Sequence, residues 1–335
     1  MTVRRTVAFS KNSANLFFHM LTECNLNCRH CYINPEQHGK TRVPLKTIKA
    51  WLDVFSDKSA APNLIFLGGE PTLHPNLAEA VKYARNRGFS SITIDTNGFL
   101  FHDILDRVSP EEVDFFSFSL DGATRRTSDA IRGQGSYDAC TKGIHRTVSA
   151  GFATSLIYTV SRANIDELAS MPALLSDLGV ERFFIQVIGL RGKASRSDAK
   201  TALQVSRSEW LQTIPSLAQK IAALGITVSY PKVYLEPEEP FECAGRVARN
   251  YFVFPNGRVY QCPLCEDLPI HSLELKNNQL IPTAKLNESD LFELNIPEGC
   301  VMNKLIQPDN ISYTVGGVPE YKIGCCLLKE EISPQ

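Results

Sequence analysis

Three cysteines near the N-terminus form the sharpest chemical pattern in this sequence. Cys24, Cys28 and Cys31 follow a C-x3-C-x2-C spacing. Thiolates hold iron–sulfur clusters, which normally take four of them, so three would leave one iron open to another ligand. Zinc is the alternative, and it would need a fourth protein ligand, for which His30 is the local candidate.

Polar motifs follow three successive apolar runs of the chain. They are Gly68, Gly69, Glu70 and Pro71 after the first run, Thr96 and Asn97 after the second, and Ser119 and Asp121 at the end of the third. Paired glycines allow close approach of the backbone to a ligand, and a carboxylate can accept hydrogen bonds from an ammonium group. The second and third motifs are equally typical of ordinary turns.

Most of the other cysteines gather in the last third of the chain. They are Cys243, Cys262, Cys265, Cys300, Cys325 and Cys326. Two apolar runs, 251–254 and 258–262, are separated by Pro-Asn-Gly and predict a β-hairpin that brings Cys243 and Cys262 together. Cys140 lies within a predicted helix, where a core position is expected.

Composition excludes several classes of protein. The 335 residues carry a formal net charge of -1, which argues against bulk nucleic acid or an anionic membrane as the main partner. We find no apolar run long enough to span a bilayer and no signal peptide, so we expect a cytoplasmic protein. In a reducing cytosol, ten clustered cysteines indicate metal ligands or catalytic groups rather than disulfides.

Alternating strands and helices are expected to position these residues. Strands are predicted over 15–21, 63–67, 91–95, 113–120, 153–160 and 182–188. Helices are predicted over 44–55, 76–88, 136–151, 165–179 and 208–225. Six such units predict an α/β fold, a partial (β/α)6 barrel with a parallel sheet, in which loops after the strands build the active site.

The pattern changes near residues 230–240, where the alternation stops. We therefore expect an N-terminal extension over 1–13, the barrel and a linking helix over 14–235, and a small α+β domain over 236–335. The basic stretch 191–200 is interpreted either as a mobile charged loop or as a face toward an anionic substrate.

With these motifs in place, the chain resembles the radical S-adenosylmethionine (SAM) superfamily, whose signature is C-x3-C-x2-C. The resemblance implies a [4Fe–4S] cluster on Cys24, Cys28 and Cys31, with SAM chelating the fourth iron. It implies that the segment Gly68–Pro71 holds the SAM amino group and that Ser119 lies near the ribose and methionine portions. It also implies that Arg132 pairs with the SAM carboxylate, with Asn97 and Asp121 as further candidates for SAM binding.

The C-terminal cysteines resemble a SPASM domain only in its opening signature, formed by Cys243, Gly257 and Cys262. The later spacing differs, and six cysteines are too few for two fully ligated clusters. The shortened twitch domain, with one auxiliary [4Fe–4S] cluster, is the better match. Its other two ligands would come from Cys265, Cys300, Cys325 and Cys326, with only one of the adjacent pair ligating; zinc or buried thiols remain the alternative.

The resemblance implies an enzyme that cleaves SAM reductively to a 5′-deoxyadenosyl radical and abstracts hydrogen from its substrate. A flavodoxin- or ferredoxin-type reductant is implied as partner. The cluster motif begins at Cys24, which leaves no room for an N-terminal leader-peptide-binding domain, so we expect a small-molecule substrate. A peptide-modifying enzyme is the alternative, and a non-catalytic iron–sulfur or zinc protein is a more remote one.

Overall fold

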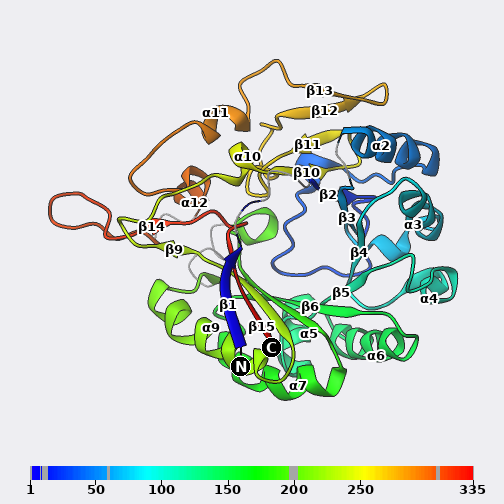
Figure 1. The fold of residues 1–335 in the computed structure, drawn as a ribbon, viewed down its shortest axis with the longest axis horizontal. Coiled ribbons are helices and arrows are strands. Elements are labelled where there is room, and N and C mark those ends of the chain that lie inside the picture. Colours follow the sequence, from blue (N-terminus) through cyan, green and yellow to red (C-terminus); the bar gives the residue numbers. More distant parts are fainter. Residues whose placement is uncertain are drawn as a thin grey trace.

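The computed structural model describes residues 2–7, 9, 14–58, 61–195, 203–306 and 310–334. Its centre is a curved parallel sheet with helices on its outer side (Figure 1). The parallel strands are β2 (Ala14–His19), β3 (Asn63–Leu67), β4 (Ser91–Thr96), β5 (Phe115–Ser119), β6 (Thr154–Val160), β7 (Arg182–Val187) and β8 (Thr227–Pro231). Each is paired in parallel with the next, which confirms the predicted α/β fold.

Helices that connect the strands form the outer layer. They are α1 (Pro35–His38), α2 (Leu45–Lys58), α3 (Leu77–Asn86), α4 (Ile104–Arg107), α5 (Arg125–Arg132), α6 (Ser136–Ser149), α7 (Met171–Leu178) and α9 (Arg207–Ala222). The 3-10 turns are η1 (Pro71–Leu73), η2 (Phe101–Asp103), η3 (Ile165–Ser170) and η4 (Gly192–Ser195). The helix expected over 165–179 is divided into η3 and α7, because Pro172 has no N–H and is accommodated only at a helix start.

Side-chain alternation along the strands separates the packed core from an internal cavity. In β4, Ile92 and Ile94 are fully buried, whereas Asp95 lines the cavity. Burying an aliphatic side chain of this size contributes about 1.5–3 kcal/mol. Repetition of this pattern fixes which residue of each strand faces the helices and which can reach a ligand.

The C-terminal part extends the sheet beyond β2. The strand β10 (Arg249–Val253) pairs in parallel with β2, and β11 (Arg258–Tyr260) pairs with β10 in the predicted hairpin. The hairpin turns at Gly257, whose φ of 85° favours glycine. The sheet continues through β12 (Leu273–Lys276) and β13 (Gln279–Pro282), and the remaining elements are β9 (Tyr234–Leu235), α10 (Ala244–Val247), α11 (Glu288–Phe292), α12 (Val301–Ile306) and β14 (Lys322–Ile323).

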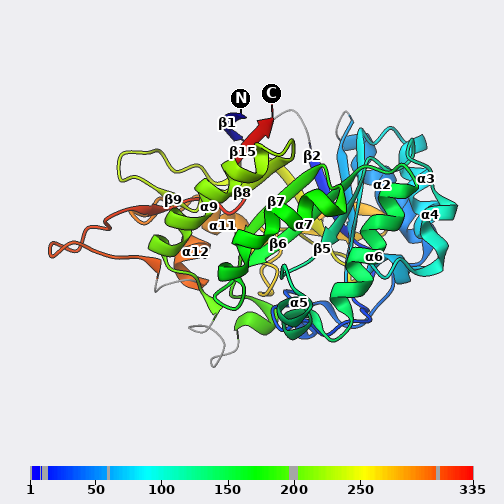
Figure 2. The ribbon, with the colours of Figure 1, turned by 90° about the horizontal axis from the view of Figure 1, so that it is seen from below.

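The two ends of the chain meet at the other edge of the barrel, as Figure 2 shows. The strand β15 (Lys329–Pro334) pairs with β8, and β1 (Thr2–Val7) pairs with β15. The sheet therefore contains strands from all three expected regions, 1–13, 14–235 and 236–335. Edge strands present unpaired backbone groups, and here the C-terminal segment covers the edge of β8. A local sequence pattern cannot reveal such a distant pairing.

No helix in the described part of the chain is both long and apolar enough to cross a bilayer.

Candidate functional site

The loop after β2 places all three N-terminal cysteines on one internal cavity. Cys24, Cys28 and Cys31 line a cavity of about 350 Å³ at the carboxyl ends of the barrel strands. The loop is held by backbone bonds, from Arg29 N to Ile131 O at 2.9 Å and from Lys193 N to Cys31 O at 2.9 Å. The chain thus fixes the cysteine loop to the segments that follow β5 and β7.

The surroundings of these cysteines favour ligands of a metal cluster over free, ionised thiolates. The pKa of Cys24 is raised to about 12, mainly by burial and to a smaller extent by Glu70, Cys28 and Cys31. The pKa of Cys28 is also raised by burial. Buried thiols of this kind ionise only beside positive charge, which bound iron would supply.

His30 does not turn toward the three cysteines as a fourth ligand would. Its Nε2 lies 3.1 Å from the Asp121 carboxylate. Within the described residues, no three His, Cys, Asp or Glu side chains are grouped to hold a single metal ion. His30 therefore belongs to a buried charge network, and the zinc interpretation of this motif loses its local fourth ligand.

The two glycines after β3 serve mainly to pack the chain against itself. A Cβ on Gly69 would lie 2.0 Å from Glu23 O, and one on Gly68 would lie 2.3 Å from Leu21 O. Gly68 also has a φ of 149°, which favours glycine. The backbone that these glycines approach closely is therefore the segment that leads into Cys24, and not only a ligand as predicted. Both glycines also line the cavity.

Glu70 joins the ends of β3 and β4. Its carboxylate accepts bonds from Thr72 N at 3.0 Å, Thr72 Oγ1 at 2.6 Å, Thr96 Oγ1 at 2.8 Å and Asn97 N at 2.7 Å. Burial raises its pKa, and these donors oppose the shift. These four bonds use the roughly four acceptor positions of a carboxylate, so Glu70 holds the two strand ends in place. Glu70 also lines the cavity.

The other predicted SAM-site residues divide into two groups. Asn97, Ser119 and Arg132 line the cavity, whereas Pro71 and Asp121 do not. Pro71 begins η1. Asn97 Nδ2 donates to Asn25 Oδ1 at 2.8 Å, so it braces the cysteine loop.

Asp121 acts from behind the cavity wall. The Arg132 Nε lies 2.6 Å from its carboxylate, and Thr159 N donates to it at 2.7 Å. Burial alone would raise its pKa, but Arg132 and His30 outweigh burial and lower the pKa to about 2. Asp121 thus orients Arg132 and remains ionised.

At the barrel mouth lies an ion pair that the sequence did not predict, between Arg191 and Glu266. Arg191 forms an ion pair with the buried Glu266, donates to Pro263 O and lies 4.6 Å from the centre of the Tyr32 ring. It therefore ties the first cysteine loop to the loop that carries Cys262 and Cys265. Of the basic stretch 191–200, residues 196–200 lie outside the described residues.

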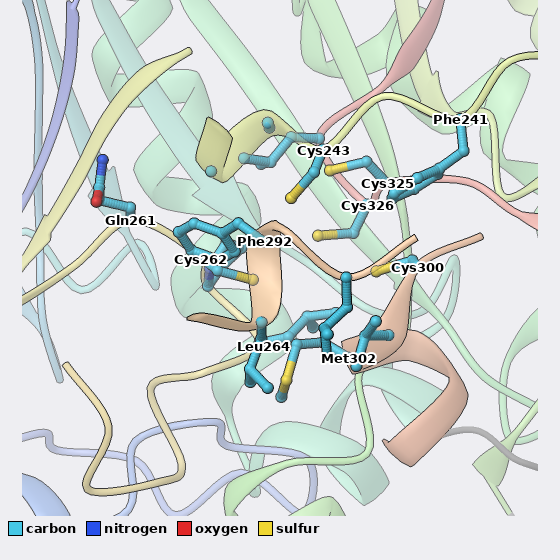
Figure 3. Close-up of a pocket in the computed structure, with 17 residues that line it drawn as sticks. Phe241, Cys243, Gln261, Cys262, Leu264, Phe292, Cys300, Met302, Cys325 and Cys326 are labelled. Carbon is cyan, nitrogen blue, oxygen red and sulfur yellow. The ribbon is translucent and has the colours of Figure 1, made fainter. Parts of the chain in front are cut away.

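A second, apolar cavity gathers the C-terminal cysteines (Figure 3). Cys243, Cys262, Cys300, Cys325 and Cys326 line it. Cys265 does not line it: this thiol is fully buried beside Cys262 and Glu288. Cys140 is buried in α6, as expected for a core residue.

Cys326 lines both cavities. The second cavity has otherwise mainly apolar walls, among them Leu264, Phe292 and Met302. Burial raises the pKa of Cys243 to about 12 and also raises the pKa of Cys300. A mainly apolar pocket with several thiols on its wall suits an iron–sulfur cluster.

Comparison with known proteins identifies the first half of the chain. Residues 19–175 match the Radical SAM superfamily. These residues therefore form a radical SAM domain. The chain is 29% identical over 192 residues to Fe-coproporphyrin III synthase of Methanosarcina barkeri, covering 56% of this chain and 47% of that protein.

Other radical SAM relatives match a longer part of the chain. Mycofactocin maturase MftC of Mycobacterium tuberculosis is 26% identical over 272 residues, covering 77% of this chain and 65% of its own length. The probable GTP 3′,8-cyclase of Saccharolobus solfataricus is 25% identical over 263 residues, covering 75% and 83%. The chain thus spans about half to two thirds of the first two relatives.

A solved structure shares the fold of this radical SAM enzyme. Streptococcus suis SuiB bound to its precursor peptide SuiA gives a TM-score of 0.64 at 12% identity, covering 89% of this chain and 66% of SuiB. At this identity the likeness shows the fold alone. Iron–sulfur and SAM binding follow from the superfamily, and the residues that perform them here are assigned below.

Proposed function

We propose that this enzyme cleaves SAM at a [4Fe–4S] cluster bound by Cys24, Cys28 and Cys31 and uses the resulting 5′-deoxyadenosyl radical to abstract hydrogen from a substrate. The observation that carries the proposal is the single cavity lined by these cysteines, Gly68–Glu70 and Arg132. The cluster would supply the electron that breaks the sulfonium bond. The chain supplies binding, orientation and exclusion of water.

Each cavity residue has a defined task in this proposal. Asn97 and Lys193 hold the cysteine loop, through Asn25 and Cys31 O respectively. Arg132, oriented by Asp121, would present its remaining N–H groups to the SAM carboxylate. Ser119 and the Gly68–Glu70 turn would border the rest of the methionine portion.

We further propose a twitch-like auxiliary [4Fe–4S] cluster in the second cavity. Cys243, Cys262 and Cys300 are assigned as ligands with one of Cys325 and Cys326, because all of these thiols line that cavity. Cys265 is left out of the proposed ligand set, since it does not line this cavity. Such a cluster could accept an electron from a substrate radical or bind the substrate directly.

A small-molecule substrate is the first candidate, and it would share the cavity of about 350 Å³ with SAM. Peptide modification is the second candidate, favoured by the similarity to a maturase over 77% of this chain. In either case we expect a low-potential donor such as flavodoxin or ferredoxin in the cytoplasm.

Iron analysis tests both clusters. In anaerobically reconstituted protein we expect about eight irons per chain in the wild type and about four in a Cys24→Ala, Cys28→Ala, Cys31→Ala triple variant. Cys140→Ala serves as control and should keep the wild-type iron content. Near-zero iron in the triple variant would remove the auxiliary cluster from the proposal.

Product analysis tests the reaction class. With SAM and dithionite, the wild type should release 5′-deoxyadenosine, measured by chromatography, and the triple variant should release none. A protein that binds iron but releases no 5′-deoxyadenosine would support the non-catalytic iron–sulfur alternative instead.

A further inference from the structure

Lys329 is the first residue of β15, and its side chain brings a positive charge into the cavity lined by the three N-terminal cysteines. It lines the same cavity as Cys24, Cys28 and Cys31. Its ammonium lies 5.2 Å from the centre of the Phe184 ring. Burial lowers the pKa of Lys329, and the nearby Cys326, Asp95 and Glu331 oppose that shift. The half-buried side chain therefore carries its charge in the place where a substrate must bind.

The acidic groups near Lys329 do not neutralise it. Glu331 is paired with Arg5 at 2.5 Å and accepts the Ser229 hydroxyl. Asp95 accepts a bond from Ser117, and burial raises its pKa to about 7. At neutral pH Asp95 is therefore only partly ionised, so it compensates only part of the lysine charge.

The other charged residues on the cavity wall already have close partners. Arg132 is paired with Asp121, and Arg191 with Glu266. Glu70 accepts bonds from two threonine hydroxyls and two backbone N–H groups. With Arg132 assigned to SAM and Arg191 paired with Glu266, Lys329 is the cation of the described wall that is left for a substrate.

Lys329 also lies on the side of the barrel away from the proposed SAM residues. Those residues follow β3, β4 and β5, whereas β15 is at the far side of β8 in the sheet. Phe184 and Gln186, two residues apart on β7, line the cavity next to this side. Three residues before Lys329, Cys326 opens onto the second cavity. A ligand on Lys329 would therefore lie between the SAM residues and the C-terminal cysteines.

We propose that Lys329 binds a carboxylate of the substrate, with the Gln186 amide beside it and the Phe184 ring against the apolar part. This rests on the proposed function, because it names the substrate class of the same cavity. A single ammonium with one amide donor matches a carboxylate, whereas phosphates are usually held by several N–H donors or a bidentate arginine. The substrate is therefore a small carboxylic acid.

Thermal unfolding of the SAM-loaded holoenzyme tests this site. A ligand that binds only the folded state stabilises it by RT ln(1 + [L]/Kd), so the unfolding midpoint rises with ligand concentration and affinity. The probes are acetate, propionate and glutarate at fixed ionic strength, with acetamide and propionamide as neutral counterparts and phosphate as a second anion. The variants are Lys329→Met, Lys329→Arg and the matched control Lys49→Met, whose lysine lies 5.1 Å from the Tyr83 ring outside the cavity.

We expect carboxylates, and not the amides, to raise the wild-type midpoint. Apparent affinity should fall about tenfold or more in Lys329→Met, as for loss of a charged hydrogen bond. It should persist in Lys329→Arg and Lys49→Met. The iron content of the Lys329→Met variant is the folding control, and it should equal that of the wild type.

Equal carboxylate responses in the wild type and Lys329→Met would overturn the site, as would equal responses to acetate and acetamide. A Lys329-dependent response to phosphate alone would overturn the carboxylate class. The proposed function fails separately, through absence of 5′-deoxyadenosine, because the midpoint shift does not depend on SAM cleavage.

Discussion

At the scale of single residues, the cavity is built from buried polar groups whose charges are balanced by nearby partners. Asp121, Glu70 and Glu266 each have several donors or a cation. Asp95 differs, because the bond from Ser117 and the charge of Lys329 only partly offset the effect of burial on its pKa. We expect this raised pKa to appear as a pH dependence of stability.

We predict that Asp95→Asn flattens this pH dependence. Burial raises the pKa of Asp95 from 3.8 to about 7. The folded state therefore keeps its proton where the unfolded state has lost it, and the free energy of unfolding falls as pH rises through this window. Denaturant unfolding at pH 5.5, 7 and 8.5 should show the wild type losing up to a few kcal/mol, and Asp95→Asn losing less.

The control for this comparison is Asp53→Asn, since the side chain of Asp53 is 39% exposed on the surface. It should keep the wild-type slope. A slope that is the same in the wild type and Asp95→Asn would mean that Asp95 ionises normally in the folded protein.

At the scale of elements, the strand ends are positioned by close contacts between successive loops. The Gly68–Gly69 turn after β3 packs on the backbone of residues 21–23, just before Cys24. We predict that Gly69→Ala displaces the cysteine loop, because its Cβ would lie 2.0 Å from Glu23 O. Reconstituted Gly69→Ala should bind clearly less iron in the first site and should unfold at a lower denaturant concentration.

Gly316→Ala is the matched glycine control. A Cβ there would meet only Thr314 Oγ1 at 3.8 Å. Its iron content and stability should equal those of the wild type. If Gly69→Ala behaved like Gly316→Ala, the packing of this turn would have no part in holding the cysteine loop.

The same scale shows what local sequence can predict. The runs 63–67 and 91–95 mark β3 and β4 almost to the residue, because buried strands leave a local apolar pattern. Gly68, Gly69 and Ser119 line the cavity, and the sequence points to them because they stand at the ends of apolar strands. Arg191–Glu266 and Lys329 were missed as cavity residues, because their neighbours are distant in sequence. Cys265 and Cys300 could not be separated by spacing, since only packing places Cys300 on the second cavity.

At the scale of the whole molecule, the C-terminal segment completes the barrel sheet that the earlier strands begin. Ile332 of β15 is 1% exposed and lies in register with Val228 of β8. We predict that Ile332→Ala lowers the free energy of unfolding by about 2–4 kcal/mol, through lost burial and a residual cavity. Equilibrium denaturation measures this loss.

The comparison variant is Val318→Ala, because Val318 is 60% exposed. It should change stability by at most about 0.5 kcal/mol. An Ile332→Ala protein as stable as Val318→Ala would show that β15 contributes little to the barrel.

The pairing of β1 with β15 also implies an order in which parts of the sheet form during folding. Arg4 and Glu330 are partners across 326 positions of sequence. Such pairings close the longest loops of the chain, so they form late and slow the overall folding rate. On the ribosome, β2 to β8 would emerge with the edge of β8 still open, and Lys329 would enter the cavity only after the segment between β8 and β15 has been made. A nascent chain halted before residue 329 therefore holds the three N-terminal cysteines but an incomplete cavity wall, and it exposes a strand edge to chaperones.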